Sequence, residues 1–312
     1  MELFNPNSNI DFLSWRKVSL TISIVLMLVS IALVTTRGLN YALDFTGGVL
    51  VEAHYDESIE IDQVRAALEA GGFHNAQVQS LGGTRDVSIR LQAGEDQKNA
   101  DKIAGEVLKT LKAQRPDASM TRHDFVGSSV GAQLKSDGIV AAVFVMIGIM
   151  IYIGIRFEKR FALAAIASEV HDTILTVGFF AATQMEFDLT VLASLLAVIG
   201  YSINDKVVVF DRVRELFRLT RKADPYQILN KSINQTLSRT IMTSVTTALA
   251  MFALYFWGGP AVHGFALTML VGIVIGTLSS IFFANPILYW LGVSKVDLMP
   301  VTRDDPELAR RP

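Results

Sequence analysis

Six long apolar stretches constrain what this chain can fold into. A helix needs about 20 mostly apolar residues to cross the hydrocarbon core of a membrane. Six segments meet that requirement, at roughly 18–36, 138–156, 161–183, 190–210, 237–257 and 265–292. The first is longer than the apolar region of a signal peptide, and the residues at its end (Thr-Thr-Arg) lack a small-x-small cleavage site. The sequence therefore predicts a membrane α-helical bundle of six transmembrane helices.

The composition agrees with a membrane protein and excludes several other classes. Hydrophobic residues make up 51% of the chain and charged residues only 19%, whereas a soluble domain carries about 25% charged residues. The absence of cysteine excludes a disulfide scaffold, a thiol nucleophile and a Cys-ligated zinc or iron–sulfur site. The net charge of −2 gives no reason to expect nucleic acid as a partner.

The basic residues between the spans predict the orientation of the chain, because cytoplasmic loops are enriched in Lys and Arg. Such residues precede the first span and occupy the short loops after the second and fourth spans: Arg16, Lys17, Arg156, Lys159, Arg160, Arg212, Arg214, Arg218, Arg221, Lys222 and Lys231. The other two short loops, around 184–189 and 258–264, contain none. We therefore expect both termini in the cytoplasm, with an N-terminus at 1–17, a basic loop at 211–236 and a tail at 293–312.

The segment between the first two spans, 39–137, is then predicted to be a periplasmic α+β domain. Its periodicity predicts the elements in this order: strand 49–55, helix 61–68, strands 76–81 and 86–91 joined at Gly82-Gly83, helix 104–111 and strand 119–126. The order β-α-β-β-α-β is that of the ferredoxin-like split unit. The segment has ten Lys and Arg against fifteen Asp and Glu, so it offers no basic surface for nucleic acid or anionic lipid.

Charged residues inside the spans are the candidate functional residues, because a charge in the membrane is costly and indicates a role. They are Glu169, His171 and Asp172 in the third span, Asp205 and Lys206 in the fourth, and Arg239 at the start of the fifth.

Structural roles are open for most of these side chains. Lys206 and Arg239 could extend to the membrane surface. Glu169 could face a cytoplasmic vestibule. Asp205 could be only a hydrogen-bond partner between helices, and His171 could merely orient the carboxylate beside it.

The pair Asp205 and Arg239 carries the sharpest functional hypothesis. Asp205 lies about five residues, and Arg239 two or three, from the cytoplasmic ends of their spans, so at 1.5 Å per residue the two can share a level. If their helices are neighbours, the guanidinium favours the ionised carboxylate while burial disfavours it. Such a carboxylate is a plausible protonation switch, and His171 adds a group that titrates near neutral pH.

Small and polar residues indicate which spans contact protein. Gly272, Gly276, Ser279 and Ser280 recur at three- and four-residue spacing in the last span, which permits close contact with another helix. The polar end of the fourth span, 200–205, is better suited to protein or water than to lipid.

Other chemistries fit the sequence poorly. The segment 169–172 does not match the His-Glu-x-x-His pattern of zinc proteases, and no Gly-x-x-x-x-Gly-Lys-Ser/Thr motif supports ATP hydrolysis. Gly47 and Gly48 precede a predicted strand and not a helix, so they do not form a phosphate loop. Asp44 is expected to form a turn at the entrance of the external domain. We expect no catalytic residue, no metal site and no cofactor.

Several motifs together resemble one family. The segment 43–48 reads Leu-Asp-Phe-Thr-Gly-Gly and contains Asp44, Gly47 and Gly48. The third span contains His171-Asp172, and the segment 200–205 reads Gly-Tyr-Ser-Ile-Asn-Asp, with Gly200 and Asn204. The segments 207–212 (Val-Val-Val-Phe-Asp-Arg), 236–240 (Thr-Leu-Ser-Arg-Thr) and 258–260 (Gly-Gly-Pro) follow. Over about residues 10–295 the chain resembles the SecF family, the smaller subunits of SecD–SecF protein-export complexes.

The resemblance implies a multi-pass protein of the bacterial inner membrane in the resistance–nodulation–division superfamily. It implies SecD, the SecYEG channel, membrane lipid and unfolded secretory polypeptide as partners, with YajC and YidC as further candidates. It also implies use of the proton gradient, with proton-path residues at Asp205, Arg239, His171 and Asp172. Glu169 and Lys206 do not match the family motifs, and only a secondary role is expected for them.

Two other functions stay open. A half-size exporter of small molecules or lipids would share the fold, but it would usually carry a second six-helix set. A scaffold subunit that holds SecD to the channel would leave Asp205 dispensable.

Overall fold

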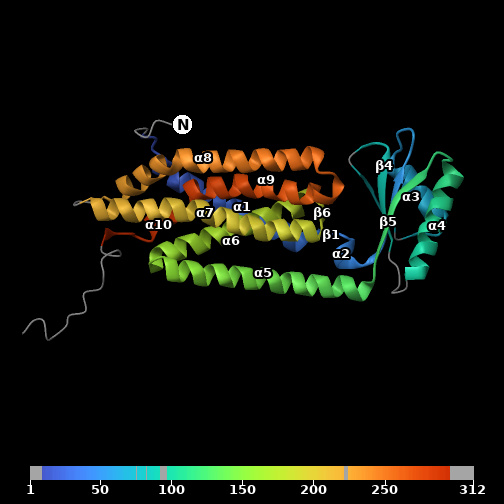
Figure 1. The fold of residues 1–312 in the computed structure, drawn as a ribbon, viewed down its shortest axis with the longest axis horizontal. Helices are drawn as coiled ribbons and strands as arrows, with labels where there is room; N and C mark the ends of the chain where they lie inside the picture. The colour runs from blue at the N-terminus through green and yellow to red at the C-terminus, as the bar shows by residue number, and fades with distance from the viewer. Residues whose placement is uncertain (1–8, 75, 82, 92–96, 221–223, 296–312) are drawn as a thin grey trace, which may run out of the picture. The chain divides into compact units, whose positions relative to one another are not determined.

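The computed structural model describes residues 9–74, 76–81, 83–91, 97–220 and 224–295. The expected turn residue Gly82, part of the basic loop (Arg221, Lys222) and most of the expected tail lie outside the described residues. The chain forms two compact units (Figure 1). We call them the helical unit (up to Leu39, Val143–Met185 and from Thr190) and the sheet unit (Asn40–Ala142 and Glu186–Leu189).

Six helices in the described part of the chain are long and apolar enough to cross a membrane, as the sequence predicts. They are α1 (Arg16–Thr36), preceded by the 3-10 turn η1 (Leu13–Trp15), α5 (Ser128–Arg156), α6 (Lys159–Thr183), α7 (Leu189–Leu219), α8 (Pro225–Trp257) and α9 (Pro260–Ser279), which continues through a π-helical turn η2 (Ser280–Ala284) into α10 (Asn285–Trp290).

Three helices are longer than their apolar stretches. α5 begins ten residues before the expected span, α7 runs nine residues past it, and α8 starts at Pro225 instead of residue 237. Most of the expected loop 211–236 is therefore helical. The start of α8 has a local cause, because the Asp224 side chain accepts a hydrogen bond from Tyr226 N and Pro225 occupies the first turn.

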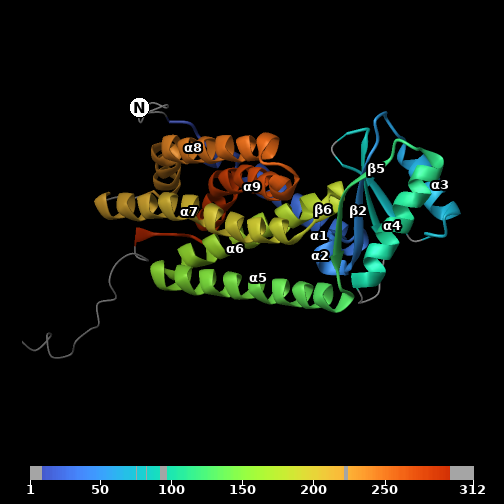
Figure 2. The same ribbon diagram turned by 45° about the vertical axis from the view of Figure 1, so that its right-hand side comes forward.

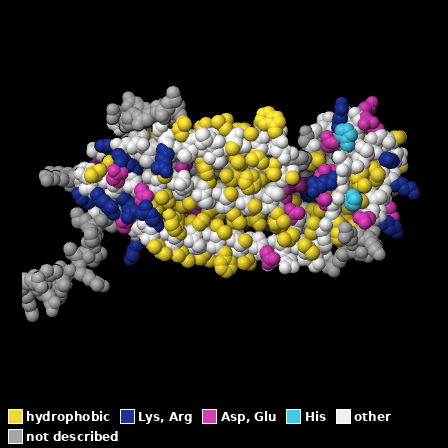
Figure 3. Space-filling model, viewed as in Figure 1, with side chains coloured by type: hydrophobic (Ala, Val, Ile, Leu, Met, Phe, Trp, Pro, Cys, Tyr) yellow, Lys and Arg dark blue, Asp and Glu magenta, His cyan; other side chains and the backbone are white. Residues whose placement is uncertain are grey.

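The basic residues gather at one end of the helical unit (Figure 3). Arg156, at the end of α5, donates to Asp211 of α7 at 2.8 Å. Arg214 of α7 donates to Glu158, between α5 and α6, at 2.9 Å. These ion pairs join the two basic loops at the same end of the helical unit.

The small residues of α9 allow it to pack closely on α7. A methyl group at Gly272 would collide with the Val198 side chain, and one at Gly276 would lie 2.7 Å from Ser202 Oγ. The small-residue stripe predicted for close helix contact therefore serves a contact within the chain.

The sheet unit contains a four-stranded antiparallel sheet in the order β3-β4-β2-β5. In chain order its elements are β2 (Gly48–His54), α3 (Ile61–Ala70), β3 (Gln77–Ser80), β4 (Asp86–Leu91), α4 (Gln97–Gln114) and β5 (Ser119–Val126). Both helices pack on one face of the sheet (Figure 2). Val49, Val51 and Ala53 of β2 point into the core beneath them, as the alternation predicts.

Two short elements precede β2. β1 (Asn40–Tyr41) pairs in parallel with β6 (Glu186–Phe187), and α2 (Leu43–Thr46) follows β1. Gly47 and Gly48 then turn the chain into β2 with φ of 68° and 128°. A methyl group on Gly48 would collide with the carbonyl oxygen of Leu91, and one on Gly47 would lie 2.7 Å from Ser128 Cα. Both the positive φ and the lack of space require glycine here.

We predict that Gly48→Ala destabilises the sheet unit. The added methyl group must displace the β4 backbone, which costs about 1–3 kcal/mol, or roughly 5–15 °C in the melting temperature of a unit this small. Thermal melting followed by proteolysis within the sheet unit measures the loss. Gly105→Ala is the matched control, because Gly105 lies in α4 with no atom within 4 Å of an added methyl group. A Gly48→Ala protein as stable as this control would contradict the argument.

Candidate functional site

Lys206 lies at the centre of a buried group of charged side chains in the helical unit. Its Nζ donates to Asp172 Oδ2 at 2.7 Å and to Glu169 Oε2 at 2.9 Å. The Lys206 side chain is 0% exposed and both carboxylates are 1% exposed. Lys206 therefore does not extend to the membrane surface, and Glu169 does not face an open vestibule. We call Glu169, His171, Asp172, Ser202 and Lys206 the buried cluster.

Helical periodicity assembles the cluster from two helices. Glu169 and Asp172 are three residues apart on α6, and Ser202 and Lys206 are four residues apart on α7, so each pair occupies one face of its helix. This spacing is visible in the sequence. It is the signal that could have assigned Lys206 and Glu169 to each other before the structure was known.

Asp172 is the most fully hydrogen-bonded carboxylate of the cluster. Its Oδ2 accepts from Lys206 and, at 2.5 Å, from Ser202 Oγ. Its Oδ1 lies 2.8 Å from His171 Nδ1. Because an ionised carboxylate only accepts, the imidazole donates through Nδ1 and leaves Nε2 as its acceptor nitrogen. This contact is the hydrogen bond that the orienting interpretation requires, and a place for His171 in a proton path stays a prediction.

Two polar atoms of the cluster are buried without a hydrogen-bond partner in the described part of the chain, Glu169 Oε1 and His171 Nε2. His171 stacks on Phe283 of η2 at 4.1 Å and lines a cavity of about 370 Å³ between α1, α6 and α9. The other lining side chains are mostly apolar, including Ile22, Leu175 and Ile275. Buried unpartnered polar atoms are uncommon and indicate a place where a proton, water or ligand can be accommodated.

Asp205 belongs to a different surface of α7. It is buried, and Arg239 and Lys206 are the cations that act on it electrostatically. Arg239, on α8, is exposed, and among the described residues no ion pair within 4.0 Å joins it to Asp205. Asp205 Oδ2 has no hydrogen-bond partner in the same part of the chain. The structure therefore brings Lys206 into direct contact with two carboxyl groups, whereas Asp205 forms no ion pair with Arg239 among the described residues.

The residues of the glycine-rich motif lie in the sheet unit. Asp44 Oδ2 accepts a hydrogen bond from Leu189 N at 3.0 Å. Gly47 and Gly48 form the turn into β2. In the fourth-span motif, Gly200 has no atom within 4 Å of an added methyl group and Asn204 is exposed. Neither of these two residues contacts the buried cluster through a hydrogen bond among the described residues.

Sequence and structure comparisons assign the chain to a family. The model of the SecD/SecF protein export membrane protein C-terminal region matches residues 106–294, and that of the SecD/SecF GG motif matches residues 32–59. The protein translocase subunit SecF of Pseudomonas aeruginosa is 44% identical over 95% of this chain and 96% of its own length. That of Escherichia coli O157:H7 is 40% identical over 93% and 90%. The chain belongs to the SecF family of protein translocase subunits. This SecF-family protein is therefore a multi-pass protein of the bacterial inner membrane.

Solved structures of SecDF have the same fold. The crystal structure of SecDF, a translocon-associated membrane protein from Thermus thermophilus, is 31% identical and superposes with a TM-score of 0.83 over 92% of this chain. A second crystal structure, of SecDF in a super-membrane-facing form, is 32% identical with a TM-score of 0.67 over 93% of this chain. In both cases the SecF-family chain spans 39% of the SecDF chain, so it corresponds to about two fifths of that protein.

We predict that Lys206→Met strongly destabilises the helical unit. The substitution removes the cation that contacts the buried carboxyl groups of Glu169 and Asp172, which costs about 3–5 kcal/mol. Melting of the detergent-solubilised protein, followed by loss of monodisperse material, measures the effect.

Lys102→Met provides the comparison for this prediction. Lys102 pairs with Glu106 at 3.9 Å on the exposed surface of α4. Exposed pairs contribute about 0–1 kcal/mol, so this variant should melt close to the unmodified protein. Equal melting temperatures for the two variants would show that the buried ion pairs do not hold α6 to α7.

Proposed function

We propose that this SecF-family subunit uses the proton gradient to assist export of polypeptides, with Asp205 as a proton-coupling residue. The observation that carries the proposal is a carboxyl group buried in a membrane helix with one oxygen lacking a hydrogen-bond partner among the described residues. Burial disfavours the ionised form of this carboxyl group, whereas Arg239, Lys206 and the Thr243 side chain favour it. Exchange of a proton is therefore the change of state available to the group.

Arg239 is suited to the role of electrostatic partner at a distance. Its guanidinium keeps its charge at all physiological pH values, so it is a fixed counter-charge while the carboxyl group gains and loses a proton. In the state described, the two groups attract each other without forming an ion pair. A closer approach of α7 and α8 would form that pair and favour release of the proton. His171 and Asp172 are further proton-path candidates by family resemblance.

Arg239 also supports SecD as a partner of the chain. The exposed face of α8 carries apolar side chains such as Val245, Leu249 and Phe252. An exposed arginine at this position is costly in lipid, so we expect SecD to cover it. This chain matches only 39% of the length of the SecDF chain from Thermus thermophilus. That protein therefore carries a SecF-like part and additional sequence in one chain. SecYEG, YajC and YidC are proposed as more distant partners, and no bound cofactor is proposed beyond the gradient.

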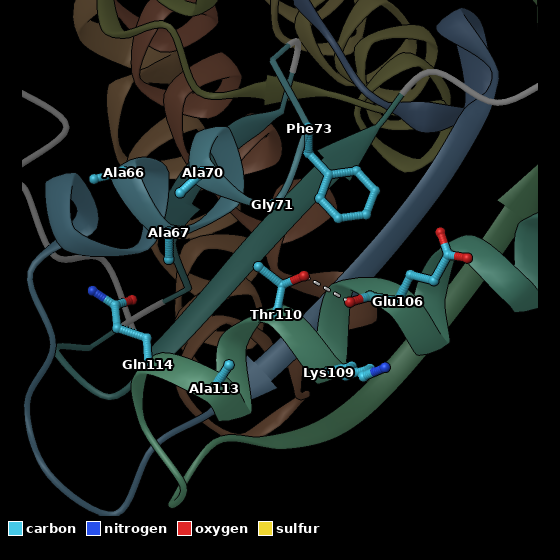
Figure 4. A pocket seen from close by; sticks show the side chains of 10 residues that line it. All are labelled: Ala66, Ala67, Ala70, Gly71, Phe73, Glu106, Lys109, Thr110, Ala113 and Gln114. Atoms are coloured by element: carbon cyan, nitrogen blue, oxygen red, sulfur yellow. Dashed lines mark hydrogen bonds between the residues drawn. The ribbon is translucent and has the colours of Figure 1, made fainter.

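We propose that the sheet unit is a ferredoxin-like domain on the periplasmic side, where it contacts emerging polypeptide. A groove of about 830 Å³ lies between α3 and α4 (Figure 4). The small side chains Ala66, Ala67 and Ala70 line it from α3, and Glu106 and Lys109 line it from α4, with Phe73 as the aromatic member of the lining. A groove lined by small side chains and one aromatic ring suits the close approach of an extended apolar segment.

Asp205→Asn tests the coupling role. The amide keeps the shape and hydrogen-bonding capacity of the carboxyl group but cannot exchange a proton, so gradient-dependent export should disappear while folding and SecD assembly persist. Release of a secretory precursor, measured with and without a proton gradient in membranes that lack the unmodified subunit, provides the readout. Arg239→Lys should also impair the gradient-dependent part, because the planar guanidinium is lost.

Asp62→Asn is the control for this export assay. Asp62 is an exposed residue that pairs with Arg65 on the surface of α3. Normal gradient-dependent export by Asp205→Asn would refute the coupling role and favour a scaffold function.

The proposed orientation has its own test. A reporter that is active only outside the cytoplasm should work when inserted near residue 90 and fail when inserted near residue 220, because the basic loops are retained in the cytoplasm. The basic end of the helical unit supports this orientation (Figure 3). Reporter activity near residue 220 would reverse it.

A further inference from the structure

The charges of the buried cluster do not cancel. Two carboxylates, Glu169 and Asp172, share one ammonium group, Lys206. Among the described residues, the neighbouring elements add no further cation: η2 stacks Phe283 on His171, Ser279 of α9 contacts Ser168 of α6, and α1 adds apolar side chains and serines beside His171. The other charge that Lys206 acts on is the Asp205 carboxylate of its own helix. In the described part of the chain, no other Lys or Arg lies within 4.0 Å of either carboxylate. A net charge in a membrane interior is costly, so the cluster is expected to bind one positive charge.

The two carboxylates are stabilised unequally. Asp172 interacts with three donors, the Lys206 ammonium, the Ser202 hydroxyl and His171 Nδ1. Glu169 accepts only from Lys206 through Oε2, and its Oε1 is buried without a partner in the described residues. Hydrogen bonds to an ionised carboxylate favour ionisation, and their absence disfavours it. The unbalanced charge is therefore most readily removed at Glu169.

His171 is less suited to hold the positive charge. Its Nδ1 is used by Asp172, so a further proton would be placed on Nε2. Nε2 has no partner among the described residues, and His171 lines a cavity whose other side chains are mostly apolar. A protonated imidazole would expose a charged donor to this apolar cavity, whereas protonation of Glu169 neutralises a charge.

We propose that Glu169 carries a bound proton and that the buried cluster is a one-proton site in which Lys206 is a permanent, tethered counter-ion for Asp172. The proton binds the Glu169 carboxylate and forms a neutral carboxylic acid, and no other bond is made or broken. The cluster is thus a second proton site, with its proton on α6, distinct from Asp205 on α7. The use of this proton in export rests on the proposed function, but its presence does not.

The geometry of α7 links the two sites. Asp205 and Lys206 are consecutive, so their side chains leave the helix about 100° apart. Lys206 faces α6, and Asp205 is attracted by Arg239 of α8. A rotation of α7 changes the surroundings of both groups together, so binding of a proton at one site affects the other.

Infrared spectroscopy of the full chain in lipid tests the proposal. With glutamate labelled by ¹³C, the C=O stretch of a protonated glutamic acid is separated from that of aspartic acid, so Asp205 does not contribute. We expect a band near neutral pH that is lost in Glu169→Gln. Asp172→Asn should remove it as well, because Glu169 then becomes the sole counter-ion of Lys206.

Glu158→Gln is the matched control for the infrared experiment. Glu158 also has one buried oxygen without a partner among the described residues, and it pairs with Arg214. The charges around Glu158 cancel, because the two cations Arg156 and Arg214 pair with the two carboxylates Glu158 and Asp211. The band should therefore persist in this variant. Absence of the band in the unmodified protein, or its persistence in Glu169→Gln, would overturn the proposal.

A second measurement covers the case in which single variants fold poorly. Lys206→Met should melt at a lower temperature, and Lys206→Met/Asp172→Asn should recover much of that loss, because a neutral Glu169 then leaves no charge in the cluster. If Glu169 is ionised, the double variant still holds one unpaired buried carboxylate and melts well below the unmodified protein. Neither measurement uses a gradient or a secretory precursor, so their failure is distinguishable from failure of the Asp205 role.

Discussion

The contacts of Lys206 with Asp172 and Glu169 are the interaction on which the helical unit depends. Between helices in a membrane the hydrophobic effect contributes little, because lipid tails are as apolar as the side chains they replace. Close packing and polar contacts then decide which helices meet. Here one fully buried ammonium of α7 contacts two carboxyl groups of α6, and Ser202 of α7 adds a hydrogen bond to one of them. The arrangement is costly to assemble but allows few alternatives, since any other helix pairing would leave these charges unpaired.

The sheet unit is stabilised by a different force. Its core consists of apolar side chains from β2, β3, β4 and the two helices packed on them. β2 is central, since it pairs with β4 on one side and β5 on the other. The turn at Gly47 and Gly48 therefore determines how the chain enters the strand that organises the whole sheet. This explains why a short glycine pair can be the recognisable motif of a much longer segment.

The sequence predicts the elements well because their causes are local. Apolar length predicts the six long helices, and alternation predicts β2 with its buried Val49 and Val51. The two-residue strands β1 and β6 have no such signal, since pairing across about 145 residues leaves no periodicity. The sequence analysis did not predict that α7 and α8 extend beyond their apolar stretches. Hydropathy predicts only the part of a helix that lies in the membrane, whereas the capping residues indicate where the helix begins and ends.

The candidate site was only partly predictable for a geometric reason. Counting residues from the end of a span estimates the depth of Asp205 and Arg239 but not the direction in which each side chain points. Direction follows from helical periodicity, which places Glu169 with Asp172 and Ser202 with Lys206. Locating a titratable residue in a span therefore requires both its depth in the membrane and the helix face on which its side chain lies. Counting along the span gives the first, and helical spacing together with the neighbouring helix gives the second.

Ser202 links the packing of α7 on α9 to the charges of the buried cluster. Its hydroxyl donates to Asp172 of α6, while its side chain fills the space left by Gly276 of α9. One small residue thus engages two helices at once, and Val198 engages α9 again one turn away, opposite Gly272. Sliding α7 along α9 would move Val198 and Ser202 away from the space beside Gly272 and Gly276. We therefore expect α7 and α9 to move together as one rigid pair. A movement of this helix pair relative to α6 would change the hydrogen bond from Ser202 to Asp172. The charge state of the buried cluster therefore depends on the position of α7 and α9.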